Sequence, residues 1–393
     1  MKHREITIWL FAGLLCAGTS SLWGSEGTVK PVTPNASPEA VELLKFLYSI
    51  SGKHTMTGQH NFPNTKDTST QQAARNWGKV PAIYGQDWGF AKEGDKDSYL
   101  ARPDIVAECK RQYGMGSIVT ICWHAVPPTA DEPVVFAQRR GGPAPQRPSG
   151  PGPAPEKLAS VQGKLTDEQF KDVLTPGTEL YNRWCAQVDT VAGFLKQLQD
   201  ARVPVLWRPY HEMNGDWFWW GGRRGEYSTA KLYRQIFDRY VHHHKLTNLI
   251  WVWSVDRPER EDRKFADYYP GAEYFDIASL DVYGEFKQSY YDDLLKVAAG
   301  KPLALAEVGR APTIEILAKQ PGWTWWMTWA GMGGGRKGEG ANPIQTLVND
   351  PRSWSLTDPV YIKAIGPLRT ASGLPPAPPA PQAPPSAATR PTP

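Results

Sequence analysis

Cysteine is scarce in this chain, with four residues among 393. Cys16 lies in an N-terminal apolar run, so Cys109, Cys122 and Cys185 remain for the rest of the chain, an odd number that cannot pair completely. Their spacing matches no zinc-binding pattern. We therefore expect buried thiols, with one disulfide as the alternative, and a fold held together by its apolar core.

A large excess of one charge is also missing. The formal net charge is +4, the pI is about 8.7, and Lys and Arg are scattered along the chain. A basic stripe, a phosphate-binding loop and a dinucleotide fingerprint are all absent, so we expect no nucleic-acid partner and no nucleotide cofactor.

Metal-binding motifs are incomplete. His211-Glu212 lacks the second histidine of a zinc-protease helix, because position 215 is glycine. The adjacent His242, His243 and His244 close a predicted helix, and neighbouring residues do not share one helix face. We expect neither a metal nor any other cofactor.

Only one apolar run, Ile6 to Ala17, stands out, and it is too short to span a membrane. Lys2 and Arg4 precede it and small residues follow, which is typical of an export signal. We expect a signal peptide over residues 1–24, a secreted or periplasmic protein, and no membrane attachment in the mature form. A lipid anchor on Cys16 is the disfavoured alternative, because Leu15 stands where a small residue is expected.

Aromatic residues, by contrast, are abundant, with 17 Trp and 16 Tyr. Several of them follow the apolar run 203–206, in the segment Trp207 to Gly222. In this segment four consecutive aromatic residues come after the polar residues Arg208, His211, Glu212 and Asn214. A carboxyl group between an imidazole and an amide, walled by indoles, can be held neutral as a proton donor. Since indole faces also bind sugar rings, this stretch indicates carbohydrate chemistry.

Apolar strand-like segments alternate with helical patterns along the chain. Such continuous apolar strands are typical of a parallel sheet covered on both faces, and eight of them predict an α/β fold, a single (β/α)8 TIM barrel over residues 38–370. The predicted strands are Met56–Phe62, Pro81–Gly89, Gly116–His124, Val203–Tyr210, Asn248–Ser254, Phe275–Tyr283, Pro302–Ala306 and Trp323–Trp329. The predicted helices include Ala40–Ser49, Gln71–Trp77, Ala101–Tyr113, Asp189–Asp200 and Thr229–His244.

Two segments break this rhythm. Residues 127–157 are rich in Pro and Gly and have few apolar side chains, so we expect a mobile insertion after the third strand that can border the cleft. Residues 371–393 are rich in Pro and Ala and predict a disordered tail.

Two glutamates stand at strand ends that should face each other across the barrel mouth. Glu212 follows the fourth strand and Glu307 follows the apolar run of the seventh. A carboxyl group is costly to bury without a role or a partner. Glycoside hydrolysis needs such a pair, about 5–5.5 Å apart in retaining enzymes. The alternatives are a salt bridge from Glu212 to Arg208 and a helix-capping role for Glu307.

The segment Arg208 to Gly215, with Gly58 to Asn61 near the start, resembles glycoside hydrolase family 26, chiefly the endo-β-1,4-mannanases. The resemblance extends from about Pro38 to Leu368. It implies a retaining enzyme that cleaves internal β-1,4-mannosidic bonds in mannan, glucomannan or galactomannan. The same barrel could instead be a β-xylanase or mixed-linkage β-glucanase of this family, or a non-catalytic sugar-binding protein. We expect a monomer that binds β-mannan or manno-oligosaccharides.

The resemblance also implies roles for individual residues. Glu212 would be the general acid/base and Glu307 the nucleophile. The residues that would bind substrate are His124 and His211 at the cleavage point, Trp217 on the leaving-group side, Tyr283 hydrogen-bonded to the nucleophile, and Trp329 stacked under the sugar.

Structural roles compete with these assignments. His124 could be a structural histidine, and Tyr283 and Trp329 could be core aromatics. Asp87 and Asp281 also end strands, and we expect them to bond Arg or His behind the site. The 127–157 insertion and Arg223-Arg224 depart from the family pattern.

Overall fold

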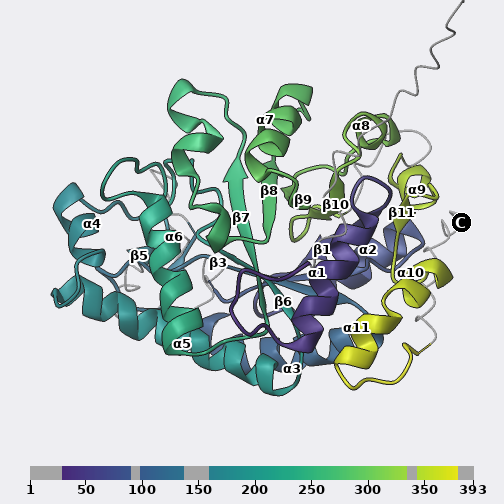
Figure 1. The fold of residues 1–393 in the computed structure, drawn as a ribbon, viewed down its shortest axis with the longest axis horizontal. Coiled ribbons are helices and arrows are strands. Elements are labelled where there is room, and N and C mark those ends of the chain that lie inside the picture. The colour runs from purple at the N-terminus through teal and green to yellow at the C-terminus, as the bar shows by residue number, and fades with distance from the viewer. Residues whose placement is uncertain (1–28, 90–97, 137–158, 334–342, 379–393) are drawn as a thin grey trace, which may run out of the picture.

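The computed structural model describes residues 29–89, 98–136, 159–333 and 343–378 (Figure 1). Eight parallel strands form a barrel in the order β1, β2, β3, β6, β7, β8, β9, β10, which closes because β10 pairs with β1. The barrel strands are β1 Thr55–His60, β2 Ile83–Asp87, β3 Ile118–Trp123, β6 Val205–Pro209, β7 Leu249–Asp256, β8 Ile277–Val282, β9 Leu303–Val308 and β10 Trp323–Thr328. Each overlaps one predicted strand, so the (β/α)8 prediction is confirmed.

Helices surround the barrel (Figure 1). They are α1 Pro38–Ile50, α2 Thr68–Trp77, α3 Arg102–Met115, α4 Asp167–Val173, α5 Glu179–Asp200, α6 Thr229–Asp238, α7 Gln288–Ala298, α8 Ile314–Lys319, α9 Pro343–Val348, α10 Pro359–Ala364 and α11 Gly366–Ala371. The first and last of these, α1 and α11, pack side by side at the edge of the barrel.

All residues of the eight barrel strands are buried, including the polar side chains of β1 and β2, and most of the strands are rich in apolar residues. Helices on the outside and side chains in the interior cover both faces of each strand. Tryptophans fill much of this core: Trp207, Trp251, Trp253, Trp325 and Trp326 each have no exposed surface. Most of the tryptophans therefore stabilise the barrel and do not contact sugar.

Helix boundaries differ most from the predictions in α5 and α6. Helix α5 begins at Glu179, well before the predicted Asp189, because Thr178 caps its N-terminus by accepting from the Tyr181 N–H. Helix α6 ends at Asp238 and continues as a π-helical turn, Arg239–His243, whereas a single helix to His244 was predicted.

Part of the Pro/Gly-rich insertion, which was expected to be mobile, is described and packs against the rest of the protein. Val134 is buried, and the short strand β4 Val134–Val135 pairs in parallel with β5 Ala159–Ser160. Phe136 lies against the ring of His124. Residues 137–157 lie outside the described residues.

The C-terminal boundary also lies later than predicted. Ser372, expected in the tail, is buried, and its hydroxyl pairs with the Tyr113 hydroxyl. Arg369 donates to the Pro375 carbonyl, which holds the chain against α3 beyond the end of α11. A further strand, β11 Ser353–Trp354, adds to β1 outside the barrel. The predicted signal peptide, residues 1–24, and the tail from residue 379 lie outside the described residues.

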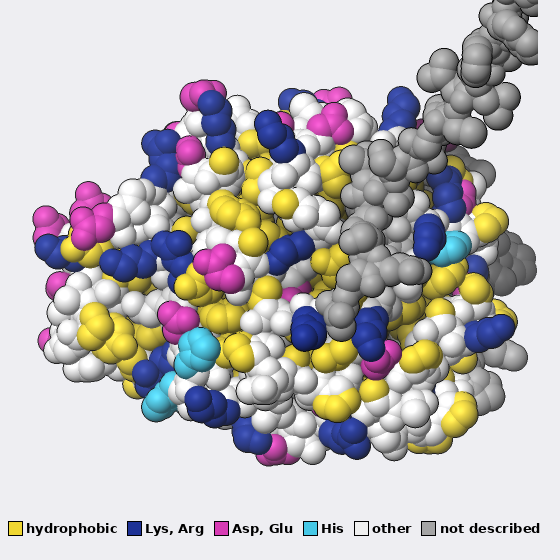
Figure 2. All heavy atoms as spheres, in the orientation of Figure 1, with side chains coloured by type: hydrophobic (Ala, Val, Ile, Leu, Met, Phe, Trp, Pro, Cys, Tyr) yellow, Lys and Arg dark blue, Asp and Glu magenta, His cyan; other side chains and the backbone are white. Residues whose placement is uncertain are grey.

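Cys109, Cys122 and Cys185 are all free thiols, so the alternative of one disulfide is wrong. No helix within the described ranges is long and apolar enough to cross a membrane. On the face shown in Figure 2, Lys and Arg side chains are interspersed with Asp and Glu.

Candidate active site

Glu212 is presented by a tight turn at the end of β6. Tyr210 and Glu212 both adopt positive φ angles, 48° and 51°, in the left-handed region that side chains other than glycine rarely occupy. Such strained residues are maintained by the surrounding structure and cluster at functional sites. The Trp217 Nε1–H, from the loop after the turn, donates to Glu212 Oε2 at 2.5 Å. The turn thus aims the carboxyl into the barrel mouth, and Trp217 holds it there.

Glu307, near the end of β9, is held by a buried guanidinium and a phenol. Arg208 donates from Nη2 to Glu307 Oε1 and from Nη1 to Asp281 Oδ2, the latter at 2.8 Å. The Tyr283 hydroxyl donates to Glu307 Oε2 at 2.8 Å, the bond that the resemblance implied. Both carboxylate oxygens are therefore fixed, and Arg208 compensates the negative charge.

Glu212 and Glu307 meet across the barrel mouth. One oxygen from each of Glu212, Asp281 and Glu307 lies within 4.8 Å of the others. Burial, followed by the negative charges of Asp281 and Glu307, raises the pKa of Glu212 well above its usual value. Glu212 is thus held as a neutral carboxylic acid beside the carboxylate of Glu307, the environment that a proton donor requires.

A chain of buried polar groups leads to Glu307 from the opposite side of the barrel. Asp87, at the end of β2, pairs with His124 Nδ1, and His124 Nε2 lies 3.2 Å from His211 Nε2. His211 Nε2 in turn lies 3.8 Å from Glu307 Oε1. Burial by itself opposes ionisation of Asp87, but the charge of His124 and its hydrogen bond lower the pKa of Asp87 to about 2.

His211 remains a neutral imidazole in this chain. Burial, together with the nearby His124 and Arg208, lowers the pKa of His211 well below its usual value. The Nε2 atoms of the two histidines are within hydrogen-bond distance, so one of them carries the proton that the other accepts. His211 Nε2 faces both His124 and Glu307, so the adjacent histidines meet beside the nucleophile.

The two glutamates share a cavity of about 580 Å³ at the mouth of the barrel. Trp329 forms one wall and is stacked on His60, with ring centroids 4.0 Å apart and planes inclined by 15°. All of the residues predicted for the site line this cavity: His124, His211, Glu212, Trp217, Tyr283, Glu307 and Trp329. A pocket of this size, with an acid and a carboxylate on one side and indoles beside them, is suited to a sugar chain.

Comparison with known proteins agrees with this geometry. The glycosyl hydrolase family 26 model matches residues 32–358. The chain belongs to glycosyl hydrolase family 26. It is 33% identical to a mannan endo-1,4-beta-mannosidase of Thermothelomyces thermophilus over 75% of this chain, and it spans 56% of that relative. It is also 29% identical to a Bacillus subtilis protein of the same name, over 83% of this chain and 89% of the relative.

A solved structure shows the same likeness. The protein GH26A from Muricauda sp. MAR_2010_75 superposes with a TM-score of 0.72 and 37% sequence identity, covering 82% of this chain and 98% of that one. The family resemblance drawn from Arg208 to Gly215 is therefore confirmed.

Two details of this family 26 site differ from the sequence-based interpretation. Arg208 pairs with Glu307 and Asp281, so the alternative of an Arg208–Glu212 salt bridge is wrong. The Asn214 amide bonds the backbone of Asp256 and Arg263 and does not contact Glu212. Its function is to fasten the β6 loop to the end of β7.

The four consecutive aromatics after the motif also divide into two kinds. Trp217 and Phe218 line the cavity. Trp219 and Trp220 are buried, and their indole N–H groups donate to the carbonyls of Ala125 and His211, respectively. The second pair therefore supports the turn that carries Glu212.

Several lining residues were missed. Asp256 ends β7 with its side chain at the cavity, but the strand was predicted to stop at Ser254. Asp256 could have been found by the same signal as Glu307, an acid at the end of an apolar run. Phe62 ends a predicted strand and Phe218 lies in the aromatic run after the motif, but neither was assigned to the site. The other missed residues come from loops and carry no strand-end signal: Phe136, Gln162, Arg257 and Met332.

Three groups of possible metal ligands come within 4.8 Å in the described part of the chain: His60, Asp87 and Cys122; Asp189, His243 and His244; Glu212, Asp281 and Glu307. In each group, at least one carboxylate already forms an ion pair with a His or Arg side chain. His124 pairs with Asp87, Arg239 and His244 pair with Asp189, and Arg208 pairs with Asp281 and Glu307. The expectation of a metal-free enzyme stays a prediction.

The Trp217 hydrogen bond provides a test of the acid. Because its N–H stabilises the ionised form of Glu212, the bond lowers the pKa of that group. Replacing Trp217 with Phe keeps an aromatic wall but removes the donor, so the pKa of Glu212 should rise. We expect the alkaline limb of the kcat/KM profile, where the acid loses its proton, to move to higher pH. A limb that stays in place or moves to lower pH would contradict this assignment.

Proposed function

We propose that this protein is a retaining endo-β-1,4-mannanase that cleaves internal bonds of mannan, glucomannan or galactomannan. The proposal depends chiefly on one observation, that carboxylate oxygens of Glu212 and Glu307 lie within 4.8 Å of each other in an indole-walled cavity. Retaining glycosidases place the two groups about 5–5.5 Å apart, whereas inverting enzymes leave roughly 6.5–9.5 Å for a water molecule. The names of the relatives supply the choice of mannan.

In the first step, Glu307 attacks the anomeric carbon while Glu212 gives its proton to the glycosidic oxygen. The carbon–oxygen bond to the leaving sugar breaks as the bond to the Glu307 carboxylate forms. Arg208 and Tyr283 orient the nucleophile through their bonds to its two oxygens. Trp217, which holds the acid, stands beside the leaving sugar.

In the second step, Glu212, now ionised, takes a proton from water as the water oxygen attacks the same carbon. The bond to Glu307 breaks, the product leaves with its original configuration, and Glu212 is protonated again. His211, neutral and buried, places Nε2 3.8 Å from Glu307 Oε1, beside the sugar that Glu307 would hold. Trp329 forms the apolar wall for the face of that sugar.

Product analysis on linear β-mannan over time tests the proposal. We expect a mixture of manno-oligosaccharides early in the reaction, as internal cleavage requires, and the β-anomer as the first product seen by NMR. If reducing ends were released faster from xylan or mixed-linkage glucan than from mannan, that polysaccharide would be the preferred substrate. Binding without new reducing ends on any of these polysaccharides would leave only a sugar-binding protein.

We further propose that residues 1–24 direct export and that the mature protein is a secreted or periplasmic monomer. The support is the short apolar run after Lys2 and Arg4, followed by small residues. N-terminal sequencing of the protein recovered outside the cytoplasm should find that the chain begins near residue 25, and light scattering should give the mass of one chain. A full-length N-terminus, or an acyl group on Cys16, would contradict the proposed processing.

A further inference from the structure

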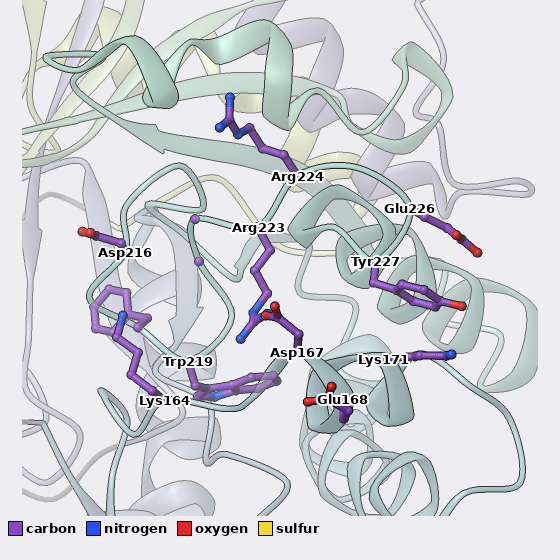
Figure 3. Close-up of a pocket in the computed structure, with 13 residues that line it drawn as sticks. Lys164, Asp167, Glu168, Lys171, Asp216, Trp219, Arg223, Arg224, Glu226 and Tyr227 are labelled. Atoms are coloured by element: carbon purple, nitrogen blue, oxygen red, sulfur yellow. The ribbon is translucent and has the colours of Figure 1, made fainter.

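A second hollow, of about 660 Å³, adjoins the catalytic cavity and is as yet without a role (Figure 3). One wall comes from the loop that also carries Glu212 and Trp217. The other comes from α4 and the residues just before it. The residues lining it are Lys164, Asp167, Glu168, Lys171, Asp216, Phe218, Trp219, Gly221, Gly222, Arg223, Arg224, Glu226 and Tyr227.

The two cavities abut on the side of the proton donor. Phe218 lines both. Trp217 lines the catalytic cavity, whereas its neighbour Asp216 lines the hollow. Likewise, Gln162 lines the catalytic cavity and Lys164 lines the hollow. A chain that passes Trp217 on the leaving-group side therefore reaches the hollow next.

The walls of the hollow are fixed before any ligand arrives. Arg223 donates to Asp167 and to the Leu165 carbonyl, each at 2.5 Å, and its guanidinium lies 4.5 Å from the ring centre of Phe170. This side chain fastens the loop to α4, as its position between them in Figure 3 also shows. At Gly221 a Cβ would lie 2.2 Å from the Gly215 carbonyl oxygen, so only glycine fits and this part of the wall carries no side chain.

The chemistry of the hollow suits a neutral, hydroxyl-rich ligand. Four cationic and four anionic side chains line it, so an anion or a cation would meet repulsion from one set. Within the described ranges, the ammonium groups of Lys164 and Lys171 form no ion pair, and the Tyr227 hydroxyl has no hydrogen-bond partner. Sugar hydroxyls both donate and accept, so they can bond to ammonium, carboxylate and phenol alike.

We propose that this hollow binds further sugar units of the polysaccharide backbone, beyond the unit that contacts Trp217 on the leaving-group side. The proposal rests on the mannanase function proposed above. Arg223 belongs to the Arg223-Arg224 pair that departs from the family pattern, and its role would be to hold the two walls together. Lys164 and Tyr227 would bond the sugar directly.

The test combines Lys164→Ala with Tyr227→Phe, which removes two hydrogen-bonding groups and leaves the Arg223 contacts intact. Lys231→Ala is the matched control, because Lys231 lies 5.0 Å from the ring centre of Tyr227 but does not line the hollow. The substrates are linear manno-oligosaccharides of increasing length and an aryl β-mannobioside, which has no sugar on the leaving-group side. An ¹⁸O label at the reducing end reports which bond is cut.

We expect kcat/KM of the double variant on long oligosaccharides to fall roughly tenfold, because two hydrogen bonds to the substrate are lost. We also expect the variant to cleave these oligosaccharides at a different bond. Activity on the aryl mannobioside and all activities of Lys231→Ala should stay at wild-type values. An equal loss on both substrates, or no loss on either, would overturn the proposal. Failure of the mannanase function looks different, since the wild-type protein would then cleave no mannoside in the series.

Discussion

Replacing Glu307 with alanine is expected to lower kcat on mannan by at least about 10⁴-fold, because removing a covalent nucleophile costs ~10⁴–10⁶ in other enzymes. The fold should survive. Arg208, which loses one carboxylate, keeps its 2.8 Å bond to Asp281, so no buried charge is left alone. Reducing-end release measures the activity, and thermal unfolding checks that the variant is folded.

Azide sharpens this test. A small anion can occupy the space of the missing carboxylate and attack the anomeric carbon from the same face. With an activated aryl β-mannoside, the Glu307→Ala variant should then yield an α-mannosyl azide, whose inverted configuration is diagnostic of the lost nucleophile. Glu285→Gln is the matched control, because Glu285 is an exposed acid shortly after Tyr283, and it should retain full activity. Substantial activity in Glu307→Ala without azide would show that the nucleophile lies elsewhere.

Replacing Glu212 with glutamine is expected to affect substrates according to their leaving groups. A sugar leaving group needs the proton that Glu212 provides, so kcat/KM on manno-oligosaccharides should fall about 10²–10⁴-fold, the usual contribution of general acid catalysis. An activated aryl β-mannoside leaves without that proton and should keep its kcat/KM to within roughly tenfold. Its kcat should fall, because the second step still needs Glu212 as a base.

The two substrates, measured on one preparation of the variant, provide the comparison. Slow breakdown of the glycosyl-enzyme should appear as a burst of aryl alcohol followed by a low steady rate, with a lowered KM. Mass spectrometry should then find a sugar bound to the protein at Glu307. Equal losses of kcat/KM on both substrates, with no burst, would assign the acid role to another group.

The barrel could be predicted because its signals are local. The eight strands are buried along their whole length, and most of them are rich in apolar residues, since helices cover one face and the packed interior the other. Their alternation with helical patterns can be seen without knowledge of long-range contacts. Glu212 and Glu307 could be found for the same reason, as acids at the ends of such runs. The (β/α)8 topology then places both at one rim.

The expectations that Asp87 and Asp281 bond His or Arg and that Tyr283 bonds Glu307 are confirmed. The pairing of Arg208 with Glu307 could not be predicted, because the two residues come from distant strands. Arg208 and Glu307 are 99 residues apart, and their pairing depends on how the closed barrel sets β6 against β9. The Asp87–His124 pair depends likewise on the register of β2 against β3, in which Asp87 lies opposite Cys122. The loop residues have no periodicity at all, which is why the place of Phe136 in the cavity wall was missed.

Composition and order of residues thus established a tryptophan-rich family 26 barrel with an acid at the end of each of two strands. Tertiary structure alone assigned Arg208 to Glu307, left Glu212 buried without a cationic partner, and thereby separated a charged nucleophile from a protonated acid. The physical reason is that pKa values depend on burial and on charges a few ångströms away, which chain closure brings together and sequence spacing does not specify.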